Sequence, residues 1–405
     1  MVKLFILISL MMFAGAAFAA GRTFPAPATE EDETELFPIY ERGKVGYIDR
    51  TGKIVIEPRF DFGDVEFRGS FTDKHFFSME LAAVAECSGA NRRCKFGFID
   101  RSGKFVVPPV FDNVQPFSFE GLAAVKTDGR WGFIDRAGQL VIALQFVEAE
   151  PFRDGFARAM LHGGRKVLVN RQGKFLRTPP GMQDLGLPSH KRVAVKIRGK
   201  WGFIDTSGNL VIRPRFEPVL NDYGEDDYVG EFASDLAAVM LKGRWGYVNT
   251  EGRLVIPPKF YRAEPFRDIS VSIAAEALSS WGVINKTGDF VSRRRFYAMH
   301  DFSEDAAAAQ VGDKWGFVDR EGRLLIPATF EQVGFFSEGL AAARIGRKWG
   351  YIDHAGKFVI EPQFDSESYF RNGLASQTIR PYSPSAPGQW GYIDRTGRFV
   401  WKSAD

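Results

Sequence analysis

The sequence has few of the residues on which most catalytic and metal sites depend. Its 405 residues include only two cysteines and five histidines, and the histidines are scattered, with no HExxH pair. No serine lies in a GxSxG turn. We therefore expect no cofactor and no metal, and we predict that the protein is not an enzyme. Carboxylates on inserted loops are the one feature that leaves a glycan-active hydrolase open as an alternative.

Net charge and long apolar runs are also lacking. The chain has 53 Lys and Arg against 50 Asp and Glu, and loss of Lys3 with a leader would leave a net charge of about +2. Such a balance gives no bulk field for nucleic acid or an anionic membrane. After the first residues, no stretch approaches the ~18 apolar residues of a membrane helix. We expect a chain that does not span a membrane and binds no nucleic acid.

The first residues are typical of a secretory signal. Lys3 is followed by the apolar run Leu4–Phe13 and by the A-x-A site Ala17–Ala19. Residues 1–19 are therefore predicted to be a signal peptide, and the alternative is a membrane anchor. Residues 20–35, with two prolines and an acidic run, are predicted to be a disordered acidic linker. The mature protein would be exported, either periplasmic or extracellular.

The two cysteines are Cys87 and Cys94, in the string ECSGANRRCKFG. They flank a loop between two strand-like runs, and a close, even pair in an exported protein predicts a disulfide. A spacing of six residues with no nearby histidine argues against zinc and against CxxC redox chemistry.

An internal repeat dominates the rest of the chain. Ten hairpin tetrapeptides, such as DRTG, DRAG and NTEG, open with Asp or Asn and close with Gly, most of them 34 to 36 residues apart. The closing glycines are Gly52, Gly103, Gly138, Gly173, Gly208, Gly252, Gly288, Gly322, Gly356 and Gly397. A period near 35 residues indicates tandem structural units. We assign residues 36–405 to one repeat domain of ten units.

Each unit reads as three short strands. In the third unit, Leu122–Val125, Trp131–Ile134 and Leu140–Ile142 are apolar runs separated by turn signals, and we call them strands A, B and C. In the B–C turn, Asp or Asn can accept a backbone N–H two residues on, and Gly suits the left-handed position of a type I turn with a G1 bulge. The fold class predicted is all-β, with three-stranded antiparallel meanders.

The recurring residues resemble a known family. WG in seven units, followed by FID, YID, YVN, VIN or FVD and then xxGK or xxGR, is similar to the bacterial WG-repeat (KWG-repeat) proteins. The exit PxF and the return FSEGLAAV resemble the rest of that repeat, over about Leu36 to Trp401. The family is loosely similar to cell-wall-binding hairpin repeats. The resemblance implies a non-catalytic binding or scaffolding role, and it supplies no cofactor and no site residues.

Units of this kind can wind as an open superhelix or close as a propeller-like ring. The first unit begins with LFPIY in place of strand A and the last ends with strand C, RFVW, so no strand is left over to complete another sheet. Ten blades also exceed the usual ~4–8 of a ring. We therefore expect an open superhelical array, with the ring as the alternative.

Three sets of side chains are candidates for binding. The tryptophans are predicted to pack between units, with a ligand-stacking ladder as the alternative: Trp131, Trp201, Trp245, Trp281, Trp315, Trp349 and Trp390. The basic residues before them are predicted to be solvated, with an edge for an anionic polymer as the alternative: Arg130, Lys200, Arg244, Lys314 and Lys348. The acidic loop Asp222–Asp227 is predicted to be solvated, with calcium binding left open.

Together these features predict an exported, non-catalytic scaffold that binds a protein or a cell-envelope polymer. A glycan-active envelope enzyme and a purely structural spacer are the alternatives.

Overall fold

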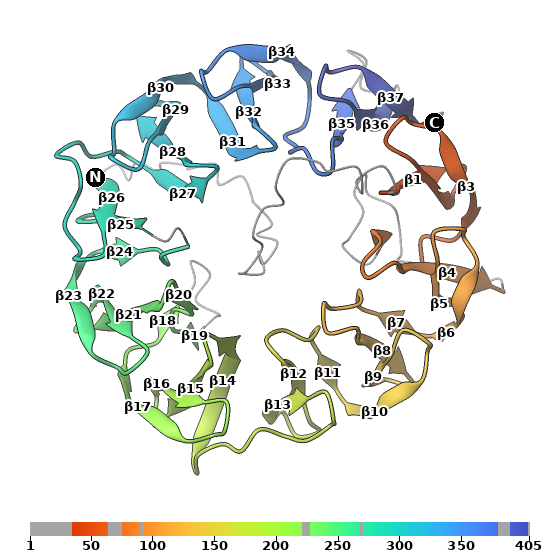
Figure 1. Cartoon of the computed structure of the whole chain (residues 1–405), viewed down its shortest axis with the longest axis horizontal. Coiled ribbons are helices and arrows are strands. Elements are labelled where there is room, and N and C mark those ends of the chain that lie inside the picture. Colours follow the sequence, from red (N-terminus) through yellow and green to blue (C-terminus); the bar gives the residue numbers. More distant parts are fainter. Residues whose placement is uncertain are drawn as a thin grey trace, which may run out of the picture.

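The computed structural model describes residues 35–63, 75–89, 93–220, 227–267, 270–379 and 389–403. The predicted signal peptide, nearly all of the predicted linker and Asp222–Asp226 lie outside these ranges. The described strands form ten sheets of three or four antiparallel strands, together with the two-stranded pair β18–β19. The ten sheets are the ten predicted units, and they stand around a ring as blades (Figure 1).

The strands are grouped by blade, in chain order. Blade 1 has β1 (Phe37–Glu41), β2 (Lys44–Ile48) and β3 (Ile54–Phe60), and blade 2 has β4 (Ala82–Ser88), β5 (Arg93–Ile99) and β6 (Phe105–Phe111). Blade 3 has β7 (Asn113–Val114), β8 (Ala123–Thr127), β9 (Arg130–Ile134) and β10 (Leu140–Phe146), and blade 4 has β11 (Glu148–Ala149), β12 (Phe156–Met160) and β13 (Lys166–Asn170). Blade 5 has β14 (Met182–Ser189), β15 (Arg192–Ile197), β16 (Lys200–Asp205) and β17 (Leu210–Phe216), and β18 (Val219–Leu220) and β19 (Asp227–Tyr228) follow it. Blade 6 has β20 (Phe232–Ala233), β21 (Leu236–Leu241), β22 (Arg244–Asn249) and β23 (Leu254–Phe260), and blade 7 has β24 (Arg262–Ala263), β25 (Val271–Ala275) and β26 (Trp281–Asn285). Blade 8 has β27 (Met299–Ser303), β28 (Ala306–Val311), β29 (Lys314–Val318) and β30 (Leu324–Phe330), and blade 9 has β31 (Gln332–Ser337), β32 (Leu340–Ile345), β33 (Lys348–Ile352) and β34 (Phe358–Phe364). Blade 10 has β35 (Ala375–Ile379), β36 (Gln389–Ile393) and β37 (Phe399–Lys402).

Strands A, B and C have the predicted order, and seven of the ten blades begin with a further strand on the inner side. Strand B is buried on both faces; in β9 every residue from Trp131 to Ile134 is buried. Strand C is the outermost strand, as β10, β23 and β34 show in Figure 1. Prolines such as Pro58 and Pro362 lie on it, because an edge strand tolerates residues that cannot donate to a sheet. In blades 4 and 7 the C segment keeps only isolated bridges to strand B: Val169 to Phe175 in blade 4, and Ile284 to Phe290 and Trp281 to Phe296 in blade 7.

The B–C turns have the predicted geometry in all ten units. In the first, Asp49 Oδ1 accepts the backbone N–H groups of Thr51 and Lys53 at 2.8 and 3.1 Å, and the Gly52 N–H donates to Asp49 O at 3.0 Å. Each of the ten closing glycines has positive φ, between 70° and 89°, where other residues are strained.

The glycine of the WG pair is required by a close backbone approach. A Cβ on Gly132 would lie 2.5 Å from the carbonyl oxygen of Ile142, on the adjacent strand C. The pairing of β9 with β10 shifts register at this point, so strand C bulges over the glycine. Gly46 and Gly350 meet strand C in the same way, at 2.6 and 2.4 Å.

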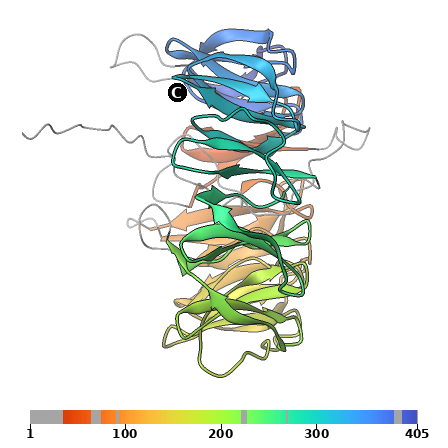
Figure 2. The ribbon, with the colours of Figure 1, turned by 90° about the vertical axis from the view of Figure 1, so that its left-hand side faces the viewer.

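The chain closes into a ring, so the expectation of an open superhelical array was wrong. The described residues form ten hydrophobic clusters, one at each junction between blades, and the tenth joins Phe37 and Ile39 of blade 1 to Leu374 and Tyr392 of blade 10. The Tyr392 hydroxyl donates to Pro38 O at 3.0 Å. Seen edge-on, the blades stand side by side around the ring (Figure 2).

Closure needs no shared strand, which is why complete terminal units did not prevent it. Within the described residues no strand of blade 1 pairs with a strand of blade 10. The two blades pack face to face, as every other neighbouring pair does. The turn glycine of one blade contacts strand C of the preceding blade, as Gly103 contacts Ile56 and Gly138 contacts Val107. The ring closure repeats this contact, because Gly52 lies against Val400 of blade 10.

Candidate binding surfaces

Most of the tryptophans lie in the core between blades. Five indoles are only 3% to 8% exposed, and they belong to the inter-blade clusters: Trp131, Trp201, Trp245, Trp349 and Trp390. Trp281 and Trp315 are partly buried against the same kind of cluster. These tryptophans therefore pack between blades, as predicted. The five buried indoles have no open face on which a ligand ring could stack. Trp401 packs on Trp390 at 5.2 Å, at the ring closure rather than at an exposed end.

The basic residues before the tryptophans take part in a repeated ion pair that we did not predict. Lys348 Nζ lies 2.7 Å from a carboxylate oxygen of Asp365, which follows the exit phenylalanine of the same blade. Four further lysine–acid pairs, at 2.6 to 4.0 Å, have the same arrangement: Lys44 with Asp61, Lys95 with Asp112, Lys200 with Glu217, and Lys314 with Glu331. Lys166 of blade 4 lies 2.9 Å from Asp184, which is on β14 of the next blade. The sequence signal is a base at the start of strand B and an acid after strand C of the same unit. Since three of the five candidate bases are paired in this way, the row is not an open cationic edge.

The acids of these pairs also join consecutive blades. Glu217 accepts the backbone N–H groups of Lys242 and Gly243, in the A–B turn of the next blade, at 3.0 and 2.9 Å. The pKa of Glu217 is lowered, chiefly because its carboxylate accepts the hydrogen bond from the Gly243 N–H. The bond from Lys95 likewise lowers the pKa of Asp112. We call the side of the ring that carries these turns the A–B face.

The A–B face departs from the repeated lysine–acid pair at blades 6 and 7. At the position of the paired acid, blades 6 and 7 have Tyr261 and Tyr297, which are 48% and 60% exposed. Leu278, in the A–B turn of blade 7, is 73% exposed. The Tyr261 N–H donates to Ala275 O at 2.7 Å, which places the tyrosine beside the end of β25, three residues before Leu278. We call Tyr261, Leu278 and Tyr297 the tyrosine sector.

The inner edge beneath this sector carries two carboxylates. Burial raises the pKa of Glu264, and the charge of Asp301 raises it further. Burial also raises the pKa of Asp301, although the Arg267 guanidinium, 3.0 Å away, opposes the shift. Arg267 and Asp301 line a cavity of about 10 Å³ with Ser272, which is room for roughly one water molecule.

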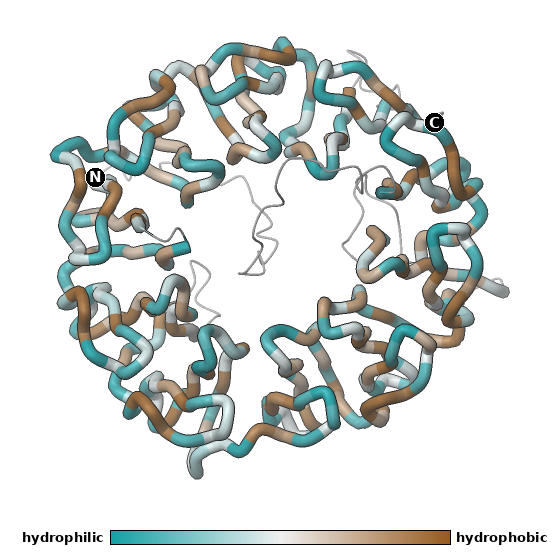
Figure 3. Tube along the Cα trace, viewed as in Figure 1, coloured by the Kyte–Doolittle hydropathy of each residue, from teal (hydrophilic) through white to brown (hydrophobic). Residues whose placement is uncertain are grey.

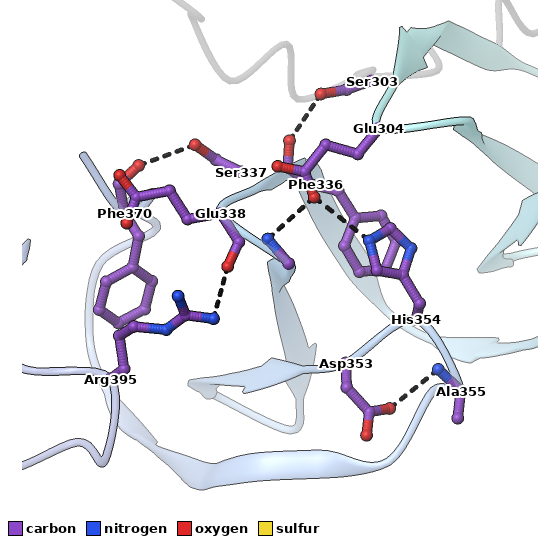
Figure 4. Close-up of polar contacts among 11 residues, drawn as sticks. Ser303, Glu304, Phe336, Ser337, Glu338, Asp353, His354, Ala355, Phe370 and Arg395 are labelled. Carbon is purple, nitrogen blue, oxygen red and sulfur yellow. Dashed lines mark hydrogen bonds and ion pairs between the residues drawn. The ribbon is translucent and has the colours of Figure 1, made fainter. Parts of the chain in front are cut away.

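The opposite side, which we call the B–C face, carries a second repeated contact that the sequence analysis missed. The return segment of one blade bonds to that of the next (Figure 4); the segments are FSED in blade 8, FSEG in blade 9 and FRNG in blade 10. The Ser303 hydroxyl donates to Phe336 O at 2.6 Å, and the Ser337 hydroxyl donates to Phe370 O at 2.7 Å. Glu304 Oε2 accepts the N–H of Gly339 at 2.9 Å. These bonds link blades 8, 9 and 10 in succession.

The second residue of the B–C turn completes this contact. His354 Nε2 lies 3.2 Å from Glu304 Oε2, and its ring stacks on Phe336 with centroids 4.0 Å apart. In the next blade, an Arg395 N–H donates to Glu338 O at 2.7 Å (Figure 4). The related segments FSED, FSEG and FRNG recur at the blade spacing and could have revealed this contact between blades.

The turn carboxylates act as caps. Among the described residues, no group of three His, Cys, Asp or Glu side chains could hold a metal ion. The pKa of Asp100 is lowered, chiefly because its carboxylate accepts a hydrogen bond from the Ser102 hydroxyl. Asp222–Asp226 lie outside the described ranges, so the structure tests neither the predicted solvated loop nor its alternative, calcium binding.

The predicted disulfide is present. Cys87 and Cys94 face each other across β4 and β5, and their sulfurs are bonded. The bond joins strands A and B of blade 2 near their A–B turn. The described ranges contain no helix with the length and apolar character needed to cross a bilayer.

Comparisons with known proteins agree with the repeat. A family model described as "WG containing repeat" matches residues 46–65, 96–131, 131–164, 201–220, 245–268, 281–315, 315–349 and 349–376. No curated protein sequence matches the chain.

Several solved structures also match the chain. A crystal structure of a eukaryotic initiation factor is 12% identical, with a TM-score of 0.51, over 76% of this chain and 93% of that one. Hsv2p of Kluyveromyces lactis is 11% identical, with a TM-score of 0.33, over 70% of this chain and 96% of that one. Dipeptidyl peptidase 4 of Porphyromonas gingivalis is 10% identical, with a TM-score of 0.44, over 79% of this chain and 57% of that one. At 12% identity, the likeness to the initiation factor concerns the fold alone.

Proposed function

We propose, on the premise that this chain belongs to the WG-containing repeat family, that it is an exported, non-catalytic scaffold that binds a protein or a cell-envelope polymer. The leader-like residues 1–19 and the Cys87–Cys94 bond support export, because disulfides persist in oxidising compartments. Cell fractionation followed by N-terminal sequencing tests this part. A mature chain that begins near residue 20 in the envelope or medium is expected, and an unprocessed cytosolic chain would contradict it.

The tyrosine sector is the observation that carries the binding proposal. Five blades pair a lysine with an acid at this level of the A–B face, but blades 6 and 7 place exposed tyrosines there. Leu278 adds a third apolar side chain whose burial in a partner would be favourable. Tyrosine is enriched where proteins bind each other, since its ring is large, rigid and able to form a hydrogen bond. A protein is therefore the partner that this sector fits.

Arg244 strengthens this assignment. It is exposed at the start of β22, and one of its N–H groups lies 3.5 Å from Glu276 O in the neighbouring blade. Tyr261 follows strand C of this blade, at the position where an acid would otherwise neutralise the guanidinium. Arginine beside tyrosine is a frequent combination at the centre of protein interfaces. We infer that the partner presents an apolar surface next to a carboxylate.

Restoring the repeat tests the proposal. In Tyr261→Asp/Tyr297→Asp, both positions receive the acid that other blades have, and the first can pair with Arg244, so folding is expected to be retained. Capture of partners from envelope extract should fall at least ten-fold, while the melting temperature stays within a few degrees. Phe119→Asp is the control, because Phe119 is 90% exposed in the return motif of the B–C face. Equal capture by the wild type and the double variant would overturn the sector as the binding site.

A further inference from the structure

The outer strands carry a positive charge excess much larger than that of the whole chain. We define the outer belt as the ten runs that begin after each B–C turn glycine: residues 53–59, 104–110, 139–145, 174–180, 209–215, 253–259, 289–295, 323–329, 357–363 and 398–402. These runs contain 16 Lys and Arg but only 3 Asp and Glu, whereas the whole chain has 53 against 50. The rest of the molecule is therefore acidic. The small net charge of the whole chain therefore does not show that positive and negative charges lie on different surfaces.

The ring turns the belt into one continuous surface. Strand C is the outermost strand of the blades that have it, so the ten runs follow one another around the circumference (Figures 1 and 2). The closure brings blade 10 beside blade 1, so Arg398 is followed by Lys53 without a gap in the series. Lys53, Lys104, Arg253, Lys357 and Arg398 occupy the same position, directly after the turn glycine, and all are exposed.

Aliphatic side chains stand between these cations. The second residue of strand C is exposed in seven blades, as is Val291 at the same position of blade 7: Val55, Val106, Val141, Val211, Val255, Leu325 and Val359. Hydrophobic segments accordingly recur on the outermost strands in Figure 3. Along β3, for example, Val55 lies two residues after Lys53, and alternate residues of a strand share a face. The belt thus alternates cationic and apolar groups.

Protection of edge strands explains only part of this pattern. Lysine and proline on an edge strand prevent pairing with other chains, and the belt has both. Protection would be served by charges of either sign, yet the belt is almost wholly cationic. Exposed valines also work against protection. Within the described residues, Lys53, Lys104 and Lys357 have no ion-pair partner, whereas Arg323 and Arg398 contact their own turn aspartates.

We propose that the outer belt binds a flexible anionic polysaccharide, with cations on its carboxylate or phosphate groups and aliphatic side chains against the C–H faces of its sugars. A convex rim favours a chain that can bend around it. A stiff duplex resists such bending, and a flat membrane would touch only a few blades. The inference rests on the proposed binding function and names the polymer, but it concerns a surface separate from the tyrosine sector.

Charge-removing variants test the belt. Lys357→Gln, Arg398→Gln, Lys53→Gln and Lys104→Gln together neutralise one cation in each of four successive blades, across the ring closure. Arg130→Gln, Arg136→Gln, Arg198→Gln and Lys242→Gln remove the same charge from exposed turn or strand-start positions off the belt and serve as the control. Affinity for polygalacturonate is measured at several salt concentrations, with single-stranded DNA as a second probe. Melting temperature and size-exclusion profile establish that each variant is folded and monodisperse.

We expect the belt variant to bind polygalacturonate about ten-fold more weakly than the control variant in 0.1 M salt. Its log affinity should also depend less steeply on log salt, since each lost contact of a flexible polyanion reduces the slope by roughly 0.7. Equal losses in the two variants would overturn the belt as a site. Belt-dependent binding of single-stranded DNA that matches or exceeds polygalacturonate would overturn the polysaccharide. Neither result affects protein capture by the tyrosine sector, which Tyr261→Asp/Tyr297→Asp measures separately.

Discussion

Gly52→Ala should open the ring at its closure. Gly52 has φ of 88°, and a Cβ there would lie 2.0 Å from the carbonyl oxygen of Val400, in the last blade. Left-handed backbone costs an ordinary residue about 1–2 kcal/mol. Forcing the neighbouring backbone aside adds roughly 1–3 kcal/mol, as overpacking does elsewhere. The total, about 2–5 kcal/mol, is a large part of the 5–15 kcal/mol that stabilises a typical domain.

Gly129→Ala is the matched control for this change. Gly129 has φ of 75°, and a Cβ there would meet no atom within 4 Å. It therefore carries the backbone strain without the clash, and the difference between the two variants isolates the contact between blades 1 and 10.

Hydrogen exchange followed by mass spectrometry is the assay, because units of a repeat protein respond locally. Gly52→Ala should raise exchange in β2 and β3 and also in β36 and β37, which lie at the opposite end of the repeat domain in sequence. A rise confined to blade 1, or equal effects of the two alanines, would refute the closed ring.

Three further changes follow from the same contacts. Gly138→Val should lower the melting temperature well below that of Arg136→Ala, because Gly138 has φ of 81° and Arg136 is exposed; equal melting temperatures would contradict the turn assignment. Trp245→Ala should cost roughly 3–5 kcal/mol and raise exchange in blades 6 and 7, since its indole is only 5% exposed in their shared cluster; unchanged exchange there would place the indole outside the core. Because the pKa of Asp100 is lowered in the folded protein, its ionised form stabilises the fold above the unfolded pKa, ~3.9, and this stability is lost as pH falls through the lower folded value. Asp100→Asn should remove that part of the acid sensitivity. An acid-unfolding curve that does not change would show that the Asp100 carboxylate does not stabilise the turn.

The local structure was predictable because it depends on short-range chemistry. A turn such as DRAG, ending at Gly138, contains both the acceptor for the backbone N–H groups and the residue that tolerates positive φ. Cys87 and Cys94 are close in sequence and flank one hairpin, so their pairing was also accessible. Strand B could be predicted because it is a short run of apolar residues, neither face of which is suited to contact with water.

The ring was not predicted because we considered only whether a strand was left over. The useful signal was the apolar character of both ends. An open array needs polar terminal caps, yet Phe37 and Ile39 begin this domain and Val400 and Trp401 end it. Each end leaves a hydrophobic face that the other covers.

The binding surfaces were missed because each depends on a comparison between blades. Tyr261 is informative only when Asp365 and its counterparts are known to bond with the lysine that begins strand B of the same blade. The belt is likewise invisible in the net charge, since its 16 cations are offset by acids on other surfaces. Alignment of the ten units by their hairpin glycines could have revealed both patterns, although their location on one face or one rim required the structure.

Site-specific photo-crosslinking tests the central claim, that the protein binds its partner through the tyrosine sector. A photoreactive phenylalanine at position 261, 278 or 297, in cells that export the protein, should yield one shared protein adduct. The same group at Asp112 or Asp365, which occupy the equivalent position in other blades, should yield none or far less. Equal crosslinking at all five positions, or an adduct confined to 112 and 365, would contradict the account.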